Sequence, residues 1–134
     1  MNPIDATIWV NYAESDLRAA YTLLESNESF PRQICFFGEQ SAERAIKAIL
    51  IFEDLYFPIG CDLDCLRDLI PKSWIIKKQF PNLSQISAWS MESCYPGNTT
   101  DVTEDEAQET LQLAEAVFNA VSAELEERIQ KDNQ

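Results

Sequence analysis

The sequence predicts an all-α domain, folded as an up-and-down antiparallel helical bundle of about four long helices with one or two short ones. Three observations predict it: apolar residues recur at helical spacing in several stretches, no stretch offers a pair of alternating strands, and the connections are short. The chain has 134 residues, the usual length of one domain. We therefore expect a single domain over residues 1–134.

Two long helices are predicted in the first part of the chain. Asn2 and Pro3 mark the start of the first, because Asn caps helices well and Pro fits the first helical position. Apolar residues then recur along one face as far as the polar stretch 26–29: Ile8, Trp9, Ala13, Leu17, Ala20 and Leu24. The second helix is predicted from about Pro31 to about Leu55. Its apolar residues cover more than one face, so we expect it to be the most buried helix.

Shorter elements are predicted in the middle of the chain. Asp62 can cap a short helix that ends before Pro71. Residues 71–81 are interpreted as a short helix or a loop, because a single apolar triplet there has no partner strand. Asn82 and Gln85 resemble a capping box that opens another helix, which would continue through Ile86, Trp89 and Met91 to the turn at residues 95–97.

The clearest local signal begins the last helix. Thr103 and Glu106 can satisfy each other's exposed backbone N–H groups, and three carboxylates favour the positive end of the helix dipole. One apolar seam follows: Ala107, Leu111, Ala114, Phe118, Val121 and Leu125. We expect residues 130–134 to fray.

The composition excludes several classes of function. Ten Lys and Arg residues against 23 Asp and Glu give a net charge of −13, so the surface would mostly repel nucleic acid. The acidic surface either keeps the domain soluble or docks a basic partner. No apolar run approaches the roughly 20 residues of a membrane span. Because the first residues do not resemble a secretory signal, we expect a cytoplasmic protein with no membrane partner.

The chain has four cysteines and no histidine, so its chemistry cannot rest on an imidazole. Reduced thiols are expected in the cytoplasm. Cys61 and Cys65 are four residues apart and could share a helix face, but a zinc site would need two further ligands. We expect neither a metal nor a cofactor.

A polar stripe interrupts the apolar second helix. Gln40, Glu43 and Lys47 fall at helical spacing within a segment rich in Ala, Ile and Leu. One interpretation is an ordinary ion pair between Glu43 and Lys47, four residues apart, within a buried network that also holds Asp16. The other is a ligand site.

Several blocks of the chain resemble the HEPN family, the higher-eukaryote and prokaryote nucleotide-binding domains. Residues 37–50 read Phe-Gly-Glu-Gln-Ser-Ala-Glu-Arg-Ala-Ile-Lys-Ala-Ile-Leu, which is similar to the family's signature on its second helix. Residues 13–20 resemble its Ala-x-x-Asp-Leu-x-x-Ala block, and residues 61–66 resemble its His-Asp-Leu-x-x-Leu block. Residues 94–96 resemble its Arg-Tyr-Pro block, and the helix from Thr103 also fits.

The resemblance implies a helical bundle that is commonly a homodimer and often pairs with a small nucleotidyltransferase as toxin and antitoxin. Active members are RNases that use an Arg followed four to six residues later by a His. Here Cys94 replaces that Arg, Cys61 replaces the histidine of His-Asp-Leu, and no histidine follows. RNA cleavage without a metal needs a base for the 2′-hydroxyl and a cation for the phosphorane charge, and both are missing at these positions.

The sequence therefore predicts a non-catalytic HEPN-type binding module. It would be a homodimer that pairs with a cognate minimal nucleotidyltransferase, in a system of the toxin–antitoxin type, or binds a nucleotide. The alternative is a divergent HEPN RNase toxin that lacks the Arg-x(4–6)-His motif. The candidate cleft or binding residues, none of them assigned a catalytic role, are Asp16, Gln40, Glu43, Lys47, Cys61, Asp62, Cys94 and Tyr95.

Overall fold

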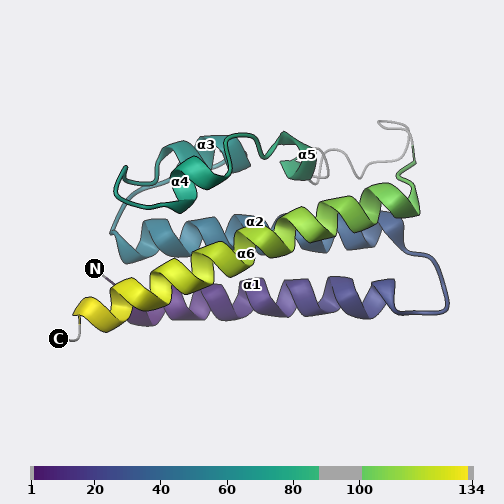
Figure 1. Cartoon of the computed structure of the whole chain (residues 1–134), viewed down its shortest axis with the longest axis horizontal. Helices are drawn as coiled ribbons and strands as arrows, with labels where there is room; N and C mark the ends of the chain where they lie inside the picture. Colours follow the sequence, from purple (N-terminus) through teal and green to yellow (C-terminus); the bar gives the residue numbers. More distant parts are fainter. Residues whose placement is uncertain (1, 88–100, 133–134) are drawn as a thin grey trace.

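Three long helices form the frame of the molecule. The computed structural model describes residues 2–87 and 101–132. The long helices are α1 (Pro3–Leu24), α2 (Pro31–Phe52) and α6 (Glu104–Asp132). α2 and α6 run in the same direction, and α1 runs opposite to both (Figure 1). The all-α fold is confirmed: the described part of the chain is helical and contains no strand.

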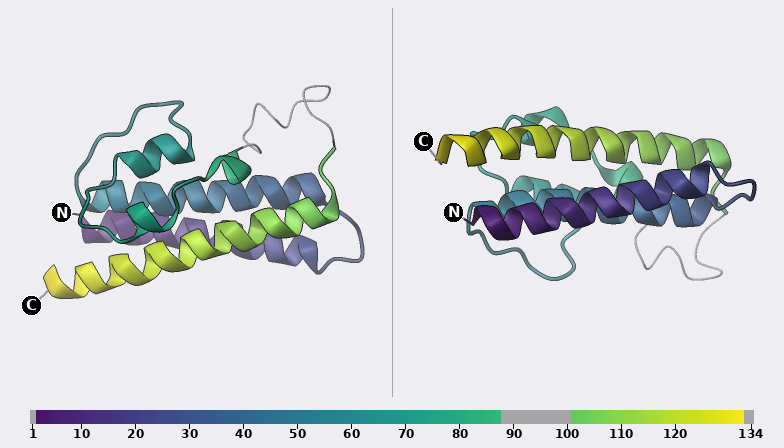
Figure 2. Two further views of the ribbon diagram at one scale, coloured as in Figure 1. Left: turned by 45° about the horizontal axis from the view of Figure 1, so that its top comes forward. Right: turned by 90° about the horizontal axis from the view of Figure 1, so that it is seen from below.

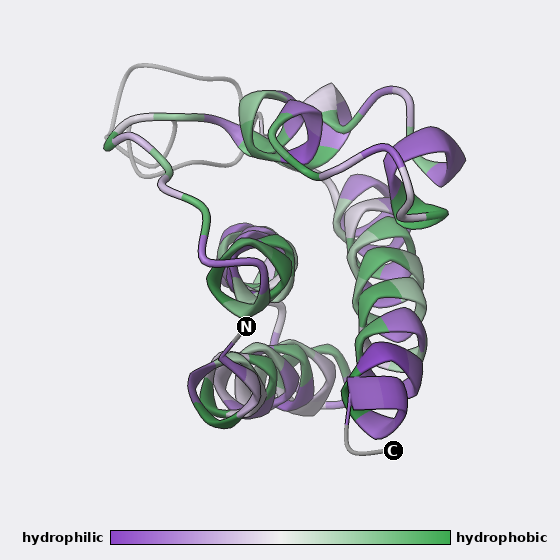
Figure 3. Ribbon diagram, turned by 90° about the vertical axis from the view of Figure 1, so that its left-hand side faces the viewer, coloured by the Kyte–Doolittle hydropathy of each residue, from purple (hydrophilic) through white to green (hydrophobic). Residues whose placement is uncertain are grey.

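Three short helices occupy the place that a third long helix, between α2 and α6 in the chain, would have in an up-and-down bundle. They are α3 (Leu63–Asp68), α4 (Ile76–Gln79) and α5 (Ser84–Ser87). They pack against α2 and α6 on the side away from α1, as Figures 1 and 3 show. The segment at 71–81 thus contains a short helix. The predicted continuation through Trp89 and Met91, and the turn at 95–97, lie outside the described residues.

Local signals set the starts of α1 and α6 where the sequence predicts them. Asn2 accepts a hydrogen bond from the backbone N–H of Asp5 at 3.3 Å and caps α1. At α6, the backbone N–H of Thr103 donates to Glu106 and that of Glu106 donates to Thr103 Oγ1, both at 3.1 Å. The capping box is therefore confirmed.

The predicted end of the second helix is wrong by a few residues. α2 ends at Phe52 rather than about Leu55, because Asp54 adopts a left-handed conformation with φ of 57° that a helix cannot continue through. At the other end of the chain, α6 extends to Asp132, and the expected fraying of residues 130–134 stays a prediction. A Lys131–Glu127 ion pair of 3.2 Å supports its last turn, and Ile129 packs against the core.

Buried residues of the long and the short helices form one hydrophobic core. Figure 2 shows the arrangement of these helices from two further sides. α2 contributes the most buried residues, as its broad apolar surface predicts. The whole predicted seam of α6 is buried: Ala107, Leu111, Ala114, Phe118, Val121 and Leu125. None of the helices in residues 2–87 and 101–132 combines the length and hydropathy needed to cross a membrane.

Candidate functional site

A polar surface lies where α1 meets α2. It consists of Asp16 on α1 and of Gln40, Glu43, Arg44 and Lys47 on α2, and we call it the α1–α2 polar face. The α2 residues fall three or four apart, so they share one stripe of a helix whose other faces are apolar. Three of the four are predicted site residues, and the structure places Asp16 with them through its ion pair with Arg44.

Asp16 and Arg44 form the pair that joins the two helices. Arg44 Nη1 lies 2.8 Å from Asp16 Oδ2, with side-chain exposures of 37% and 12%. The Arg44 guanidinium also lies 5.7 Å from the centre of the Tyr12 ring. Burial raises the pKa of the Asp16 carboxyl above its ordinary value, although the charge and hydrogen bond of Arg44 lower it in part.

Lys47 is held by a carboxylate and by two aromatic rings. Its Nζ lies 3.5 Å from Glu43 Oε1, one helical turn away. The same nitrogen lies 6.0 Å from the centre of the Trp9 ring and 5.2 Å from that of Phe57. Trp9 and Phe57 contact each other edge to face. The loop that follows α2, which contains Phe57, thus lies over the Lys47 end of the polar stripe on α2.

Glu39 is a feature of this surface that the sequence prediction missed. Its side chain is buried, and Gln40 Nε2 donates a hydrogen bond to Glu39 Oε2 at 2.9 Å. Burial, and then the negative charge of Glu43, raises the pKa of Glu39 to about 7. The sequence did contain one sign of a raised pKa at Glu39, namely its spacing of four residues from Glu43. Two carboxylates one helical turn apart repel each other.

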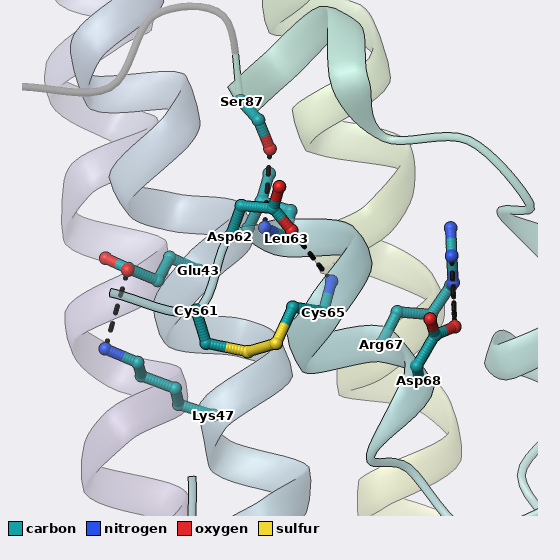
Figure 4. Close-up of a disulfide and its surroundings, with 9 residues drawn as sticks. All are labelled: Glu43, Lys47, Cys61, Asp62, Leu63, Cys65, Arg67, Asp68 and Ser87. Atoms are coloured by element: carbon teal, nitrogen blue, oxygen red, sulfur yellow. Dashed lines mark hydrogen bonds and ion pairs between the residues drawn. A yellow bond between two sulfur atoms is a disulfide. The ribbon is translucent and has the colours of Figure 1, made fainter. Parts of the chain in front are cut away.

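The prediction that Cys61 and Cys65 are reduced thiols is wrong. The two residues form a disulfide with a Cα–Cα distance of 5.4 Å (Figure 4). The physical reason is that the chain turns into α3 between them, which brings residues four apart together. A bonded sulfur has no thiolate, so Cys61 in this state is neither a base nor a nucleophile.

Asp62 has a local structural contact. Its Oδ1 accepts a hydrogen bond from the backbone N–H of Cys65 at 2.8 Å, which caps α3 as predicted. The neighbouring Leu63 N–H donates to Ser87 Oγ at 3.3 Å and ties α3 to α5 (Figure 4). Cys94 and Tyr95, the remaining candidates, lie outside the described residues.

Each of the two cations of the α1–α2 polar face is within 4 Å of a carboxylate, and the chain has no histidine. No group of three or more acidic, Cys or His side chains that could hold a metal occurs among the described residues.

The antiparallel bundle with a polar stripe set into its buried second helix defines an all-α module of the HEPN type. A family model for the HEPN domain matches residues 6–128. The chain therefore belongs to the HEPN domain family, whose members are nucleotide-binding or RNase-type modules. No curated protein and no solved structure matches the chain.

Proposed function

We propose that this protein is a non-catalytic HEPN-type binding module that acts as a homodimer. It pairs with a cognate minimal nucleotidyltransferase, in a system of the toxin–antitoxin type, or it binds a nucleotide. One observation carries the proposal: Arg44 and Lys47, the two cations of the α1–α2 polar face, are both neutralised by carboxylates of the same face.

The chemistry of RNA cleavage explains why this observation matters. A cation must be available for the charge that develops on phosphorus, and a base must take the 2′-hydroxyl proton. Arg44 would have to leave Asp16 to meet a phosphate, and Asp16 would then stay half-buried without its counter-ion. In this chain Cys94 stands in place of the motif Arg of the resembled family and no histidine follows it, while Cys61 stands in place of the histidine of the His-Asp-Leu block.

The net charge favours a protein partner over a polynucleotide. A chain at −13 repels the phosphate backbone, and an RNA would find few unpaired cations on this face. A partner protein with a basic surface would gain from the same charge. The proposal places this pairing in the cytoplasm.

Copurification tests the proposal. The tagged full chain, expressed in its own cells, is expected to recover a nucleotidyltransferase, and the charge reversal Glu43→Arg, which removes a carboxylate of the α1–α2 polar face, is expected to reduce the recovery at least about tenfold. Glu127→Arg is the matched control, because it makes the same change at an exposed pair on α6. Thermal shift with millimolar ATP tests the nucleotide form. Recovery of no nucleotidyltransferase, together with no shift, would overturn the proposal.

The divergent RNase is kept as a second candidate because of Glu39. A buried carboxyl with a pKa of about 7 can both accept and donate a proton near neutral pH. Growth on induced expression separates the two functions. Toxicity that Glu39→Gln abolishes, while the exposed Glu126→Gln retains it and both variants stay folded, would establish catalysis. The binding module predicts equal growth for all three chains.

A further inference from the structure

A disulfide fixes one end of the loop that lies over Lys47. This loop, which we call the α2–α3 loop, comprises residues 53–62, between the end of α2 and the start of α3. Its end is tied to α3, because Cys61 is bonded to Cys65. Figure 4 draws the Glu43–Lys47 pair among the surroundings of this bond. The redox state of the two cysteines therefore bears on the cover of the α1–α2 polar face.

The middle of the α2–α3 loop is weakly held. At its start, the backbone N–H of Leu55 donates to a carbonyl of α2 at 2.8 Å. Among the described residues, no backbone hydrogen bond joins residues 56–61 to the rest of the chain. The ring of Phe57 meets that of Trp9 edge to face and lies 5.2 Å from Lys47 Nζ. The position of Phe57 thus depends on these ring contacts and on how the two ends of the loop are fixed.

The second end of the loop is fixed mainly by the disulfide. With the bond present, Cys61 is joined covalently to α3, which packs against α2. Without it, the end of the loop is held to α3 by one exposed hydrogen bond, which the N–H of Cys65 donates to Asp62 Oδ1 at 2.8 Å. Gly60, with a φ of 85°, adjoins Cys61 and gives the backbone there wide freedom once the covalent tie is gone. The loop then opens more often.

Solvent reaches the disulfide in the folded chain. Cys65 is exposed, and Cys61 is half-buried. Exposed disulfides are the ones that exchange with thiols in solution, because a thiolate must reach one of the two sulfurs. The pair is therefore open to reduction and reoxidation without unfolding of the bundle.

We propose that Cys61 and Cys65 are a reversible thiol–disulfide site that controls access to Lys47. With the disulfide formed, Phe57 stays over the lysine, whose side chain is 22% exposed. With the two thiols reduced, the loop opens and the Glu43–Lys47 pair becomes available to a partner. This goes beyond the binding module proposed above, because it concerns the chain alone and holds for any partner of the α1–α2 polar face.

The reductant is a low-molecular-weight thiol of the glutathione class. Its thiolate attacks Sγ of the exposed Cys65, which forms a mixed disulfide and releases Cys61 as a thiolate that takes a proton from water. A second thiolate attacks the small-molecule sulfur of the mixed disulfide and releases Cys65. Two protein thiols and one small disulfide result, so two electrons pass from the small thiols to the protein. Oxidation by the small disulfide is the reverse.

Amine acetylation, followed residue by residue with mass spectrometry, tests the cover of Lys47. In the double variant Cys61→Ser, Cys65→Ser, Lys47 is expected to be acetylated at least about threefold faster than in the oxidised wild type. Lys77 is the internal control: it is also half-buried, and its Nζ donates to two backbone carbonyls at 3.0 and 2.7 Å, not to the α2–α3 loop. Its rate should be equal in the two proteins.

Two substitutions in the loop test whether Phe57 is the cover. Phe57→Ala is expected to make acetylation of Lys47 fast both with the disulfide and without it. Tyr56→Ala is the matched control, because Tyr56 is the neighbouring aromatic residue but is 83% exposed. It should keep the difference between the two redox states.

Mixtures of reduced and oxidised glutathione test reversibility on the wild type. The disulfide is expected to open and close while circular dichroism shows a folded chain, with slow acetylation of Lys47 restored on reoxidation. Equal Lys47 rates in the wild type and the double variant, an equal rise at Lys77, or a disulfide that resists the thiol until the chain unfolds would overturn the proposal. These measurements need no partner, so a failure of the proposed function would be seen separately, in the copurification.

Discussion

Asp16 and Arg44 connect α1 to α2 through a 2.8 Å ion pair in which the carboxylate is more deeply buried than the guanidinium. We expect Arg44→Ala to lower the free energy of unfolding by about 1 to 2 kcal/mol at pH 7, because it leaves a half-buried charge unpaired. Arg18→Ala, which breaks an exposed pair with Glu14, should cost less than about 0.5 kcal/mol. Urea denaturation of both variants makes the comparison.

The pH dependence of the stability loss in Arg44→Ala tests whether this loss comes from the ion pair with Asp16. Protonation of Asp16 removes the charge that Arg44 balances, so the difference from the wild type should shrink as the pH falls through the pKa of Asp16. A loss of stability that is the same at pH 3 and pH 7 would show that Arg44 acts through packing on Tyr12 instead.

Glu39 should make the protein less stable as the pH rises. Its pKa is about 7 in the folded chain against 4.5 for the ordinary group. Below pH 4.5 the carboxyl is protonated in both states. As the pH rises from 4.5 to 7 the unfolded chain ionises first, so stability is lost, on the order of 3 kcal/mol when complete. The isosteric Glu39→Gln should not show this loss, and it should exceed the wild type in stability at pH 8.

Urea denaturation at pH 5 and pH 8 measures the effect of Glu39. Glu126→Gln is the matched control, because it makes the same substitution at an exposed position of α6. Parallel pH profiles for the wild type and Glu39→Gln would refute the raised pKa.

Glu124, on α6, accepts hydrogen bonds from the backbone at the start of α4. Its two carboxylate oxygens accept hydrogen bonds from the backbone N–H groups of Ile75 and Ile76, at 2.8 and 3.1 Å. We expect Glu124→Ala to cost about 2 kcal/mol, because two bonds to a charged acceptor are lost. Amide hydrogen exchange should also become faster at these two residues. Glu127→Ala, on the same helix but in an exposed pair with Lys131, should change neither quantity.

The Cys61–Cys65 disulfide closes a short loop and should contribute modestly to stability. A loop of five residues corresponds to about 2 kcal/mol in the chain-entropy model. We expect dithiothreitol to lower the melting temperature of the wild type and to leave a Cys61→Ser, Cys65→Ser double variant unchanged. Equal shifts for the two proteins would show that the reductant acts elsewhere.

The redox state of this pair also tests the expected location. Structural disulfides are rare in the cytoplasm, where thiols are kept reduced. Alkylation of the cysteines during lysis, followed by mass spectrometry, should find Cys61 and Cys65 alkylated if the protein resides in the cytoplasm. Recovery of the intact disulfide would place the protein in an oxidising environment and contradict the expected location.

Features that depend on neighbours in the sequence were predictable. The caps at Asn2, Asp62 and Thr103 use side chains within three residues of the helix start, and the structure contains all three. The seam of α6 follows from its spacing alone. The Glu43–Lys47 pair, four residues apart, was expected for the same reason and is present.

Features that depend on tertiary packing were not predictable. The raised pKa of Glu39 comes mainly from burial, which no local pattern reports. The short helix α4 begins where Glu124, 49 residues from Ile75, provides acceptors. Cys61 and Cys65 were expected to be able to share a helix face, but the composition gave no reason to expect oxidation. For Cys94 and Tyr95 the comparison cannot be drawn, because they lie outside the described residues.

The attachment of α4 to α6 has a consequence for protein engineering. Arg128 donates a hydrogen bond to the Ser73 carbonyl at 2.7 Å and lies 3.9 Å from the centre of the Trp74 ring, next to the acceptors that Glu124 supplies. Side chains of α6 therefore determine where residues 73–76 pack. A foreign loop grafted between α3 and α5 would therefore keep its position only if it presented matching groups to Glu124 and Arg128.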